Sequence, residues 1–294
     1  MKLSLAPGAG VGVRVTRSRG MALIAVLWVV AALTILVTGF SRVARDEVGI
    51  VASARQGVFA QAMGDAAIAL ALREVSGVTV PIARVQQVEV VYGGVKVPVF
   101  IMPLNGLIDL NAAPPGLLLR LYVVAGGLPE NAAEALAQAT VEVRTRAGPM
   151  NQPERFEANE DLLRVPGVDY DLYARLSPLL TVYARAGGGR VNPMAAPLEV
   201  LTVLANGNAA IAGRIAQERD QGAQGVDTTS LEASFIGVSP SRRYRVTALV
   251  PLADGARMRV SRTVDLGFSS RDGLPWRTLH AERSFEPVPR TVAN

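Results

Sequence analysis

Twenty consecutive residues near the start of the chain, Met21–Phe40, carry no charge: MALIAVLWVVAALTILVTGF. As an α-helix this run is about 30 Å long at 1.5 Å per residue, enough to cross the hydrocarbon core of a bilayer. Arg14, Arg17 and Arg19 stand just before it. Because basic residues favour the cytoplasmic side of a membrane span, the sequence predicts one anchor with a cytoplasmic N-terminus and the rest of the chain outside.

Three kinds of N-terminal segment share this pattern: a cleavable export signal, a plain signal anchor, and an anchor that is processed before its apolar run. The apolar region of a secretory signal is roughly 7–15 residues long and ends at a small-residue cleavage site. The run here is longer, and the residues after it make a poor cleavage site. A plain anchor and a processed anchor therefore remain, and Gly20, directly before the run, is the candidate processing position.

Composition excludes some classes of chemistry. The chain has 294 residues and no cysteine, so disulfides, thiolate zinc sites and cysteine nucleophiles are absent. The net charge is +5, but Lys2 and Lys96 are the only lysines, and the arginines are scattered along the chain. Basic residues without blocks are weak evidence for a nucleic-acid partner. The length allows one large domain or two modest ones.

Helical patterning continues after the charge-free run. Apolar residues recur at steps of three and four along an otherwise polar stretch: Val51, Ala54, Val58, Ala62, Ala66, Ala69 and Leu72. This spacing predicts an apolar stripe on one helix face, and Ser76-Gly77 offers a C-terminal stop. We therefore expect one helix from Met21 to Ser76, with a membrane half over 21–40 and an amphipathic half over 41–77.

This order of features resembles the class-3 signal of type IV pilins and type II secretion pseudopilins. In that family a membrane aspartyl peptidase cuts after the leader glycine and methylates the new N-terminus. The resemblance implies a cleaved leader over 1–20, cleavage between Gly20 and Met21, and N-methylation of Met21. The family usually has phenylalanine at the first mature position and glutamate four residues later, whereas this chain has Met21 and Ala25. A missing glutamate is typical of the K-class minor pseudopilins.

Two β-hairpins are predicted in the remaining chain. The first lies between Val85 and Met102 and turns at Gly93-Gly94, and Pro98 indicates an edge strand. The second spans 244–266 and turns at Asp254-Gly255. We expect 78–108 and 240–270 to form one discontinuous sheet, 109–239 to be a helical insertion, and 271–294 to be a C-terminal tail.

A weak repeat runs through the predicted insertion. DLNAAPPGLLLRL, beginning at Asp109, is similar to RVNPMAAPLEVLTVL, beginning at Arg190. VVAGGLPENAAEAL is likewise similar to RVPGVDYDLYARL, which matches Gly127 with Gly167 and Leu136 with Leu176. Two small helical units are expected, 109–186 and 187–239, each too small to bury a core alone. They resemble the tandem helical, SAM-like modules of K-class pseudopilins.

A DNA-binding helix-hairpin-helix is the rival interpretation of LLRVPGVDYDLYARL, since such hairpins offer backbone N–H groups to phosphate. Asp169 and Asp171 follow the Pro166-Gly167 turn and would repel phosphate, partly offset by Arg164 and Arg175. With the export that the anchor predicts, these carboxylates favour a hairpin that only packs inside a helical domain, so no nucleic-acid partner is expected.

Signals for an enzyme or a metal site are weak. His280 is the only histidine and lies in the expected tail, and Gly8-x-Gly10-x-Gly12 has no strand before it. Glu157, Glu160 and Asp161 form an acidic cluster, which Asn159 turns into a pattern typical of a helix N-terminus. Asp220, Asp227 and Glu232 flank a glycine-rich loop and could supply oxygen ligands to Ca²⁺, which family members bind. No metal ligands are assigned.

The resemblance implies an α+β, pilin-like fold: a long N-terminal helix on an antiparallel sheet, with a large inserted α-domain. It implies a non-enzymatic minor pseudopilin in the tip complex that initiates the pseudopilus and supports export of folded proteins. Expected partners are the I- and J-class minor pseudopilins, the major pseudopilin, the prepilin peptidase and the inner membrane, with the globular part in the periplasm. The alternative is a bitopic periplasmic component of a related pilus or DNA-uptake system.

Overall fold

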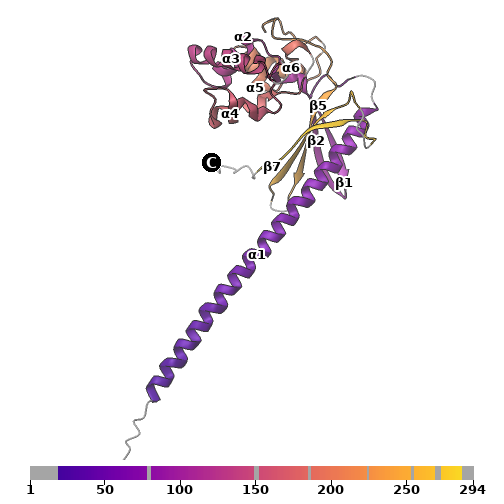
Figure 1. Ribbon diagram of the computed structural model, residues 1–294. Helices are drawn as coiled ribbons and strands as arrows, with labels where there is room; N and C mark the ends of the chain where they lie inside the picture. The colour runs from indigo at the N-terminus through magenta and orange to yellow at the C-terminus, as the bar shows by residue number, and fades with distance from the viewer. Residues whose placement is uncertain are drawn as a thin grey trace, which may run out of the picture. The chain divides into compact units, whose positions relative to one another are not determined.

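The computed structural model describes residues 19–77, 81–148, 152–184, 187–223, 225–252, 255–268 and 273–286. In the N-terminal helix, side chains are described at 23–34, at 36 and from 54 onward. The chain divides into two compact units, Met1–Gln56 and Gly57–Asn294, which are taken separately below. The protein combines helices with an antiparallel sheet, so the expected α+β class holds (Figure 1).

The first unit contains most of helix α1, which runs from Arg19 to Ser76. The expected helix over Met21–Ser76 is therefore present, and most of the leader, 1–18, lies outside the described residues. The large apolar side chains described here, from Leu23 to Leu36, are all exposed. Within the described residues, no helix combines the length and the apolarity that a membrane crossing needs.

In the second unit, five of the described strands form one antiparallel sheet in the order β1-β2-β5-β6-β7. These strands are β1 (Gln86–Tyr92), β2 (Val95–Pro103), β5 (Arg243–Pro251), β6 (Arg257–Asp265) and β7 (Arg277–Glu286). Both predicted hairpins are confirmed, as β1 with β2 and β5 with β6. Gly93 and Gly94 make the first turn with φ of 58° and 81°, which side chains rarely tolerate.

Two predictions about the sheet are wrong. Pro98 does not lie on an edge strand, because β2 pairs with β1 on one side and with β5 on the other. The ladder with β5 begins only at Val99, so a residue without an N–H is tolerated just outside it. The expected tail over 271–294 contains β7, which pairs along β6 with a register shift at Thr263/Val264. β7 is a solvated edge strand with polar residues alternating along it. Its sequence therefore has no apolar run that would predict a strand.

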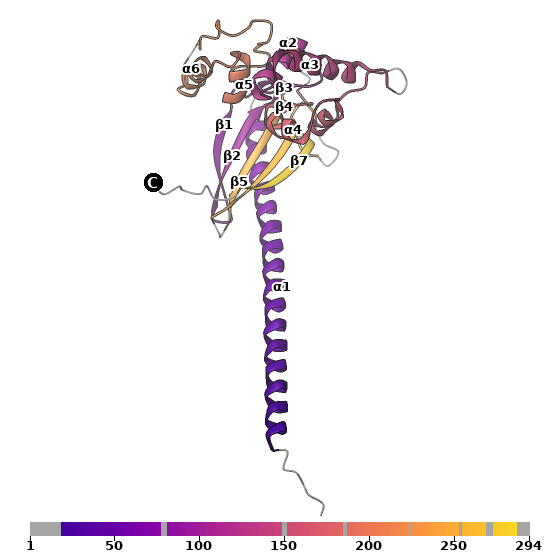
Figure 2. The same ribbon diagram turned by 90° about the vertical axis from the view of Figure 1, so that its left-hand side faces the viewer.

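The C-terminal part of α1 packs on one face of this sheet (Figure 2). Of the predicted stripe, Leu72 is buried in this contact and Ala69 packs against it. The buried residues of α1 recur at helical spacing: Ala60, Met63, Ala67, Ile68, Ala71 and Leu72. Val58, in the predicted stripe, is 66% exposed. The buried face differs from the predicted one because alanines stand at many positions around this helix, so their spacing does not single out one face. Gly64 lies so close to the sheet that a Cβ there would be 2.6 Å from a methyl group of Val260.

The helical insertion joins β2 to β5 and gathers near one end of the sheet (Figures 1 and 2). It starts at the 3₁₀ turn η1 (Leu104–Gly106), slightly before the expected residue 109. Its main helices are α2 (Pro115–Arg120), α3 (Glu130–Thr145), α4 (Tyr170–Leu176), α5 (Leu198–Leu204) and α6 (Ala209–Asp220). A short parallel pair, β3 (Ile108–Asp109) with β4 (Leu180–Thr181), fastens the middle of the insertion to its beginning.

The insertion has a hydrophobic core of its own within the described residues, distinct from the cluster between α1 and the sheet. Leu117, Leu118 and Leu121 are fully buried in it, as are Leu201 and Val203 of the second repeat. Because leucines from both halves share this cluster, the two predicted modules together bury one core.

The repeated motifs adopt similar local structures. α2 begins after Pro114, and α5 begins after Pro197. Gly127 and Gly167 both have positive φ, 68° and 97°, and each stands three residues before a helix, α3 or α4. The sequence similarity therefore corresponds to a repeated turn-and-helix geometry.

Candidate functional site

The three residues singled out by the N-terminal motif lie at the start of α1. Gly20 and Met21 are helical in backbone, and their side chains are outside the described set. Ala25 is exposed on the helix surface. Nothing in the described geometry tests cleavage or methylation, so these assignments stay predictions.

Apolar side chains also remain exposed on α1 within the second unit. Val58 and Phe59 are 66% and 64% exposed, and Leu70 is 43% exposed. They lie outside the cluster that packs on the sheet. An apolar helix surface of this kind is a candidate contact for other polypeptide chains.

The helix-hairpin-helix segment is built for packing. Leu162, Leu172 and Leu176 are buried in the core of the insertion. Asp169 caps α4, because its Oδ1 accepts a hydrogen bond of 2.8 Å from the backbone N of Leu172. This carboxylate occupies the helix N-terminus that a phosphate would need.

Within the segment 157–161, Asp161 and Asn159 make different contacts. Asp161 accepts hydrogen bonds from the backbone N of Glu157 (2.7 Å) and of Ala158 (3.1 Å), which supports the predicted capping role. The cap residue of the 3₁₀ turn η4 (Asn159–Arg164) is Ala158, so the expectation for Asn159 is wrong. The Asn159 amide instead donates to the carbonyl of Leu180 at 3.2 Å.

The candidate calcium carboxylates are not gathered into one site. Asp220 Oδ1 lies 2.8 Å from Nε of Arg219, and Asp227 Oδ2 lies 3.7 Å from Nη1 of Arg214. Glu232 pairs with Arg120 of α2. Among the described residues, no three acidic or histidine side chains lie close enough to hold a metal ion. Because separate arginines engage the three carboxylates, this donor set does not fit Ca²⁺.

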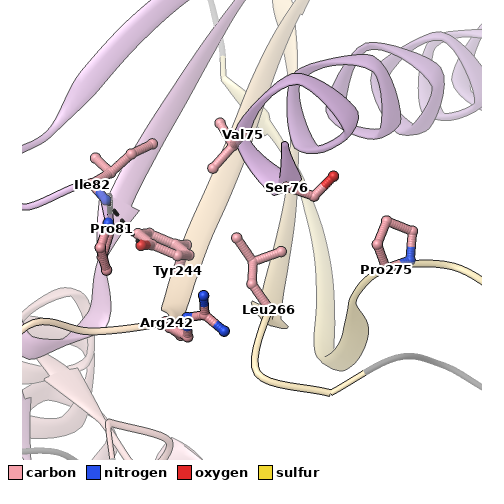
Figure 3. A pocket seen from close by; sticks show the side chains of 8 residues that line it. All are labelled: Val75, Ser76, Pro81, Ile82, Arg242, Tyr244, Leu266 and Pro275. Atoms are coloured by element: carbon pink, nitrogen blue, oxygen red, sulfur yellow. Dashed lines mark hydrogen bonds between the residues drawn. The ribbon is translucent and has the colours of Figure 1, made fainter. Parts of the chain in front are cut away.

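A small cavity of about 40 Å³ lies where the chain leaves α1 (Figure 3). Tyr244 lines it, and its hydroxyl accepts a 3.2 Å hydrogen bond from the backbone N of Ile82. The same hydroxyl donates to the carbonyl of Ser241 at 2.8 Å. Burial raises the pKa of Tyr244. Through the hydrogen bond from Ile82, Tyr244 of β5 holds the segment before β1 in place, so we interpret the role of this cavity as structural.

A larger cavity of about 320 Å³ lies between the insertion and the sheet, and we call it the polar cavity. The residues of its lining that carry charge or an aromatic ring are Glu160, Tyr173, Tyr183, Arg245, His280 and Glu282. They come from η4, α4, the segment after β4, and strands β5 and β7. His280, expected in an exposed tail, is half-buried on β7 with its ring stacked on Tyr183 at 6.2 Å between centroids.

The electrostatics of the polar cavity reflect burial and nearby carboxylates. Burial raises the pKa of Tyr173, and the charges of Glu160 and Glu282 add to the rise. Burial also raises the pKa of Tyr183, again with a contribution from Glu160. Burial lowers the pKa of Arg245, whose guanidinium donates to the carbonyl of Leu180 at 3.2 Å. The walls therefore combine negative charge, aromatic rings and one partly buried cation.

No protein-family profile matches the chain. No curated protein matches it either. A similar solved structure is a chain in the crystal structure of the GspK-GspI-GspJ complex from the enterotoxigenic Escherichia coli type 2 secretion system. The TM-score is 0.44 and the identity 14%, over 80% of this chain and 95% of that chain. This likeness is too weak to carry a functional conclusion.

Proposed function

We propose that this chain is a minor pseudopilin of the K class, a non-enzymatic structural subunit of a type II secretion machine. The observation that carries the proposal is the order of parts along α1. A basic leader precedes α1, which carries the charge-free run near its start and continues to Ser76, and the last turns of that helix pack on an antiparallel sheet. A helical insertion between the neighbouring strands β2 and β5 completes the arrangement.

In the proposed role, Met21–Phe40 anchors the protein in the bacterial inner membrane, and the second unit lies in the periplasm. The exposed apolar residues of α1, Val58 and Phe59 among them, would contact neighbouring pilin-like subunits. These neighbours would be the I- and J-class minor pseudopilins and the major pseudopilin, in a tip complex that starts the pseudopilus. Ala25, where the family usually has glutamate, supports a position at the tip.

Mass spectrometry of the mature N-terminus tests this proposal directly. In cells that contain a prepilin peptidase, we expect the protein to begin at N-methylated Met21. Gly20→Val is expected to leave an uncleaved precursor, because the peptidase requires the small residue before the cut. Gly12→Val, a matched change inside the leader, is expected to leave processing intact. A mature protein that starts at any residue other than Met21 would overturn the proposal.

A further inference from the structure

The polar cavity is formed by segments that are far apart in the chain. Glu160 and Tyr173 belong to the insertion, whereas Arg245 and Glu282 lie on strands of the sheet. All of them belong to the second compact unit. A recess lined by convergent charged and aromatic groups is a candidate binding site, which none of the sequence motifs had indicated.

Two carboxylates of this lining form no ion pair with any residue that the structure describes. Glu160 and Glu282 appear in none of the ion pairs formed among the described residues, although ten such pairs are present. Arg245 is the cation of the lining, and its guanidinium is directed to the carbonyl of Leu180. The lining contains two glutamates and one arginine, so it carries excess negative charge. This charge favours a cationic ligand.

Aromatic rings supply the second requirement of a cation site. The rings of Tyr183 and His280 are stacked with 28° between their planes. The Tyr173 hydroxyl, on another element, accepts a hydrogen bond of 3.3 Å from Ser177. A planar guanidinium can stack on such rings while its N–H groups reach carboxylates, which a compact ammonium does less well.

The size of the cavity favours a side chain over a bare ion. A volume of about 320 Å³ is far above the roughly 10–15 Å³ that one water needs on the same measure, so there is room for one long side chain. Asn159 also lines the cavity, and its buried Oδ1 lacks a hydrogen-bond partner among the described residues. A polar group left in this state is a place where a ligand or water can still add a hydrogen bond.

We propose that the polar cavity receives an arginine side chain of a polypeptide partner. Its guanidinium would lie against the Tyr183–His280 pair and donate hydrogen bonds to Glu160 and Glu282. Charge-assisted, bidentate contacts of this kind are the strong ones in proteins. The inference stands on the cavity alone and does not rest on the proposed role in secretion.

Calorimetry on the full-length protein in detergent micelles provides the test, with small capped residues as probes. We expect Nα-acetyl-arginine methylamide to bind saturably, the corresponding lysine probe to bind more weakly, and the neutral citrulline probe to give no measurable binding. Citrulline keeps the shape and loses the charge. Free L-arginine is expected to bind no more tightly than the capped probe, because the partner is a residue within a polypeptide.

Matched variants locate the binding. The double change Glu160→Gln and Glu282→Gln is expected to weaken arginine binding at least about tenfold, which corresponds to about 1.4 kcal/mol. Glu134→Gln with Glu142→Gln removes the same charge from the exposed face of α3 and is expected to leave binding unchanged. Tyr183→Phe keeps the ring and is expected to bind, whereas Tyr183→Leu is expected to lose affinity.

Several results would overturn the proposal. Equal affinity for the arginine and citrulline probes would show that charge is not recognised. Equal losses in the cavity and α3 double variants would show nonspecific attraction. A lower melting temperature of the cavity double variant, with no arginine binding by the unaltered protein, would mean that Arg245 already satisfies both carboxylates. Much tighter binding of free L-arginine would indicate a small-molecule site in place of a polypeptide contact.

Discussion

Arg243 and Asp265 form an almost fully buried ion pair across strands β5 and β6. The Nε and Nη2 atoms of Arg243 both lie 2.7 Å from Oδ2 of Asp265. The remaining guanidinium nitrogen, Nη1, donates to the carbonyl of Tyr183 in the insertion, also at 2.7 Å. Asp265 Oδ1 accepts a hydrogen bond from the backbone N of Gly267. One guanidinium therefore holds two strands together and positions a wall of the polar cavity.

Breaking this pair is expected to be costly. Asp265→Asn keeps the size of the side chain but leaves Arg243 as an uncompensated buried charge, so the free energy of unfolding should fall by about 3–5 kcal/mol. The control is Glu286→Gln, which breaks an exposed pair with Arg259 and should cost about 1 kcal/mol or less. Urea unfolding followed by circular dichroism measures both. Equal, small losses would show that solvent screens the Arg243 pair as well.

The parts of the fold that could be predicted from sequence are those fixed by local patterns. The turn at Gly93-Gly94 needs positive φ, and alternating apolar residues mark the strands beside it. The long helix follows from its composition and its stop after Ser76. The face that α1 buries could be found only in part: Leu72 lies in the predicted stripe, but alanines stand at many positions around this helix, so their spacing does not mark one face as buried.

The polar cavity could not be predicted because its residues have no common spacing. Glu160 was assigned to a helix cap together with Asp161, which alone does the capping. His280 was placed in a tail because β7 is a solvated edge strand without an apolar run. Only tertiary packing brings Glu160 and His280 into the polar cavity. Local sequence patterns therefore could not predict that they lie near each other.

Alkaline pH is expected to destabilise the insertion through Tyr122. Burial raises its pKa to about 12, and its hydroxyl lies 2.7 Å from Oγ1 of Thr140. Between the usual pKa of about 10 and this value, the unfolded chain loses a proton that the folded chain keeps. The contribution of Tyr122 to the free energy of unfolding is therefore fully present below about pH 10. It falls by roughly 2–3 kcal/mol as the pH rises to about 12. Unfolding curves of Tyr122→Phe should lack this component; identical pH profiles would refute it.

Gly189 is expected to be far less replaceable than its neighbour Gly188. Both have positive φ, 80° and 59°, so alanine costs about 1–2 kcal/mol at either position. A Cβ on Gly189 would also lie 1.9 Å from the carbonyl oxygen of Ala112, whereas one on Gly188 would meet no atom within 4 Å. We expect Gly189→Ala to cost about 1–3 kcal/mol more than Gly188→Ala. Thermal melts compare the two, and equal losses would contradict the close approach.

Ala25→Glu tests the proposed position at the filament tip. A carboxylate in lipid costs about 2.5–3.5 kcal/mol unless a cation meets it. In the pilin family the glutamate at this position is thought to pair with the N-terminal amine of the subunit ahead. A tip subunit has none ahead, so we expect no gain in assembly from Ala25→Glu. Crosslinks from the N-terminal helix are expected only to membrane-proximal neighbours; neighbours on both sides would place the protein within the shaft.

Two glycines of α1 lie near the sheet, and alanine at these positions is expected to change the free energy of unfolding in opposite directions. Gly57 and Gly64 both lie inside α1, where alanine is favoured over glycine by about 1 kcal/mol. A Cβ on Gly57 would make ordinary contacts at 3.7 and 3.8 Å, so Gly57→Ala is expected to stabilise the protein by up to that amount.

A Cβ on Gly64 would lie 2.6 and 2.9 Å from two carbon atoms of Val260, a branched side chain in the middle of β6. That crowding pushes the helix off the sheet, and we expect Gly64→Ala to destabilise by about 1–3 kcal/mol despite its better helix propensity. Combining Gly64→Ala with Val260→Ala removes the methyl group at 2.6 Å but keeps the Cβ of residue 260 at 2.9 Å. We therefore expect it to recover only part of the loss, and the truncation of a buried valine has its own cost. Strictly additive effects in this double-mutant cycle would mean that α1 does not rest on the sheet at Val260.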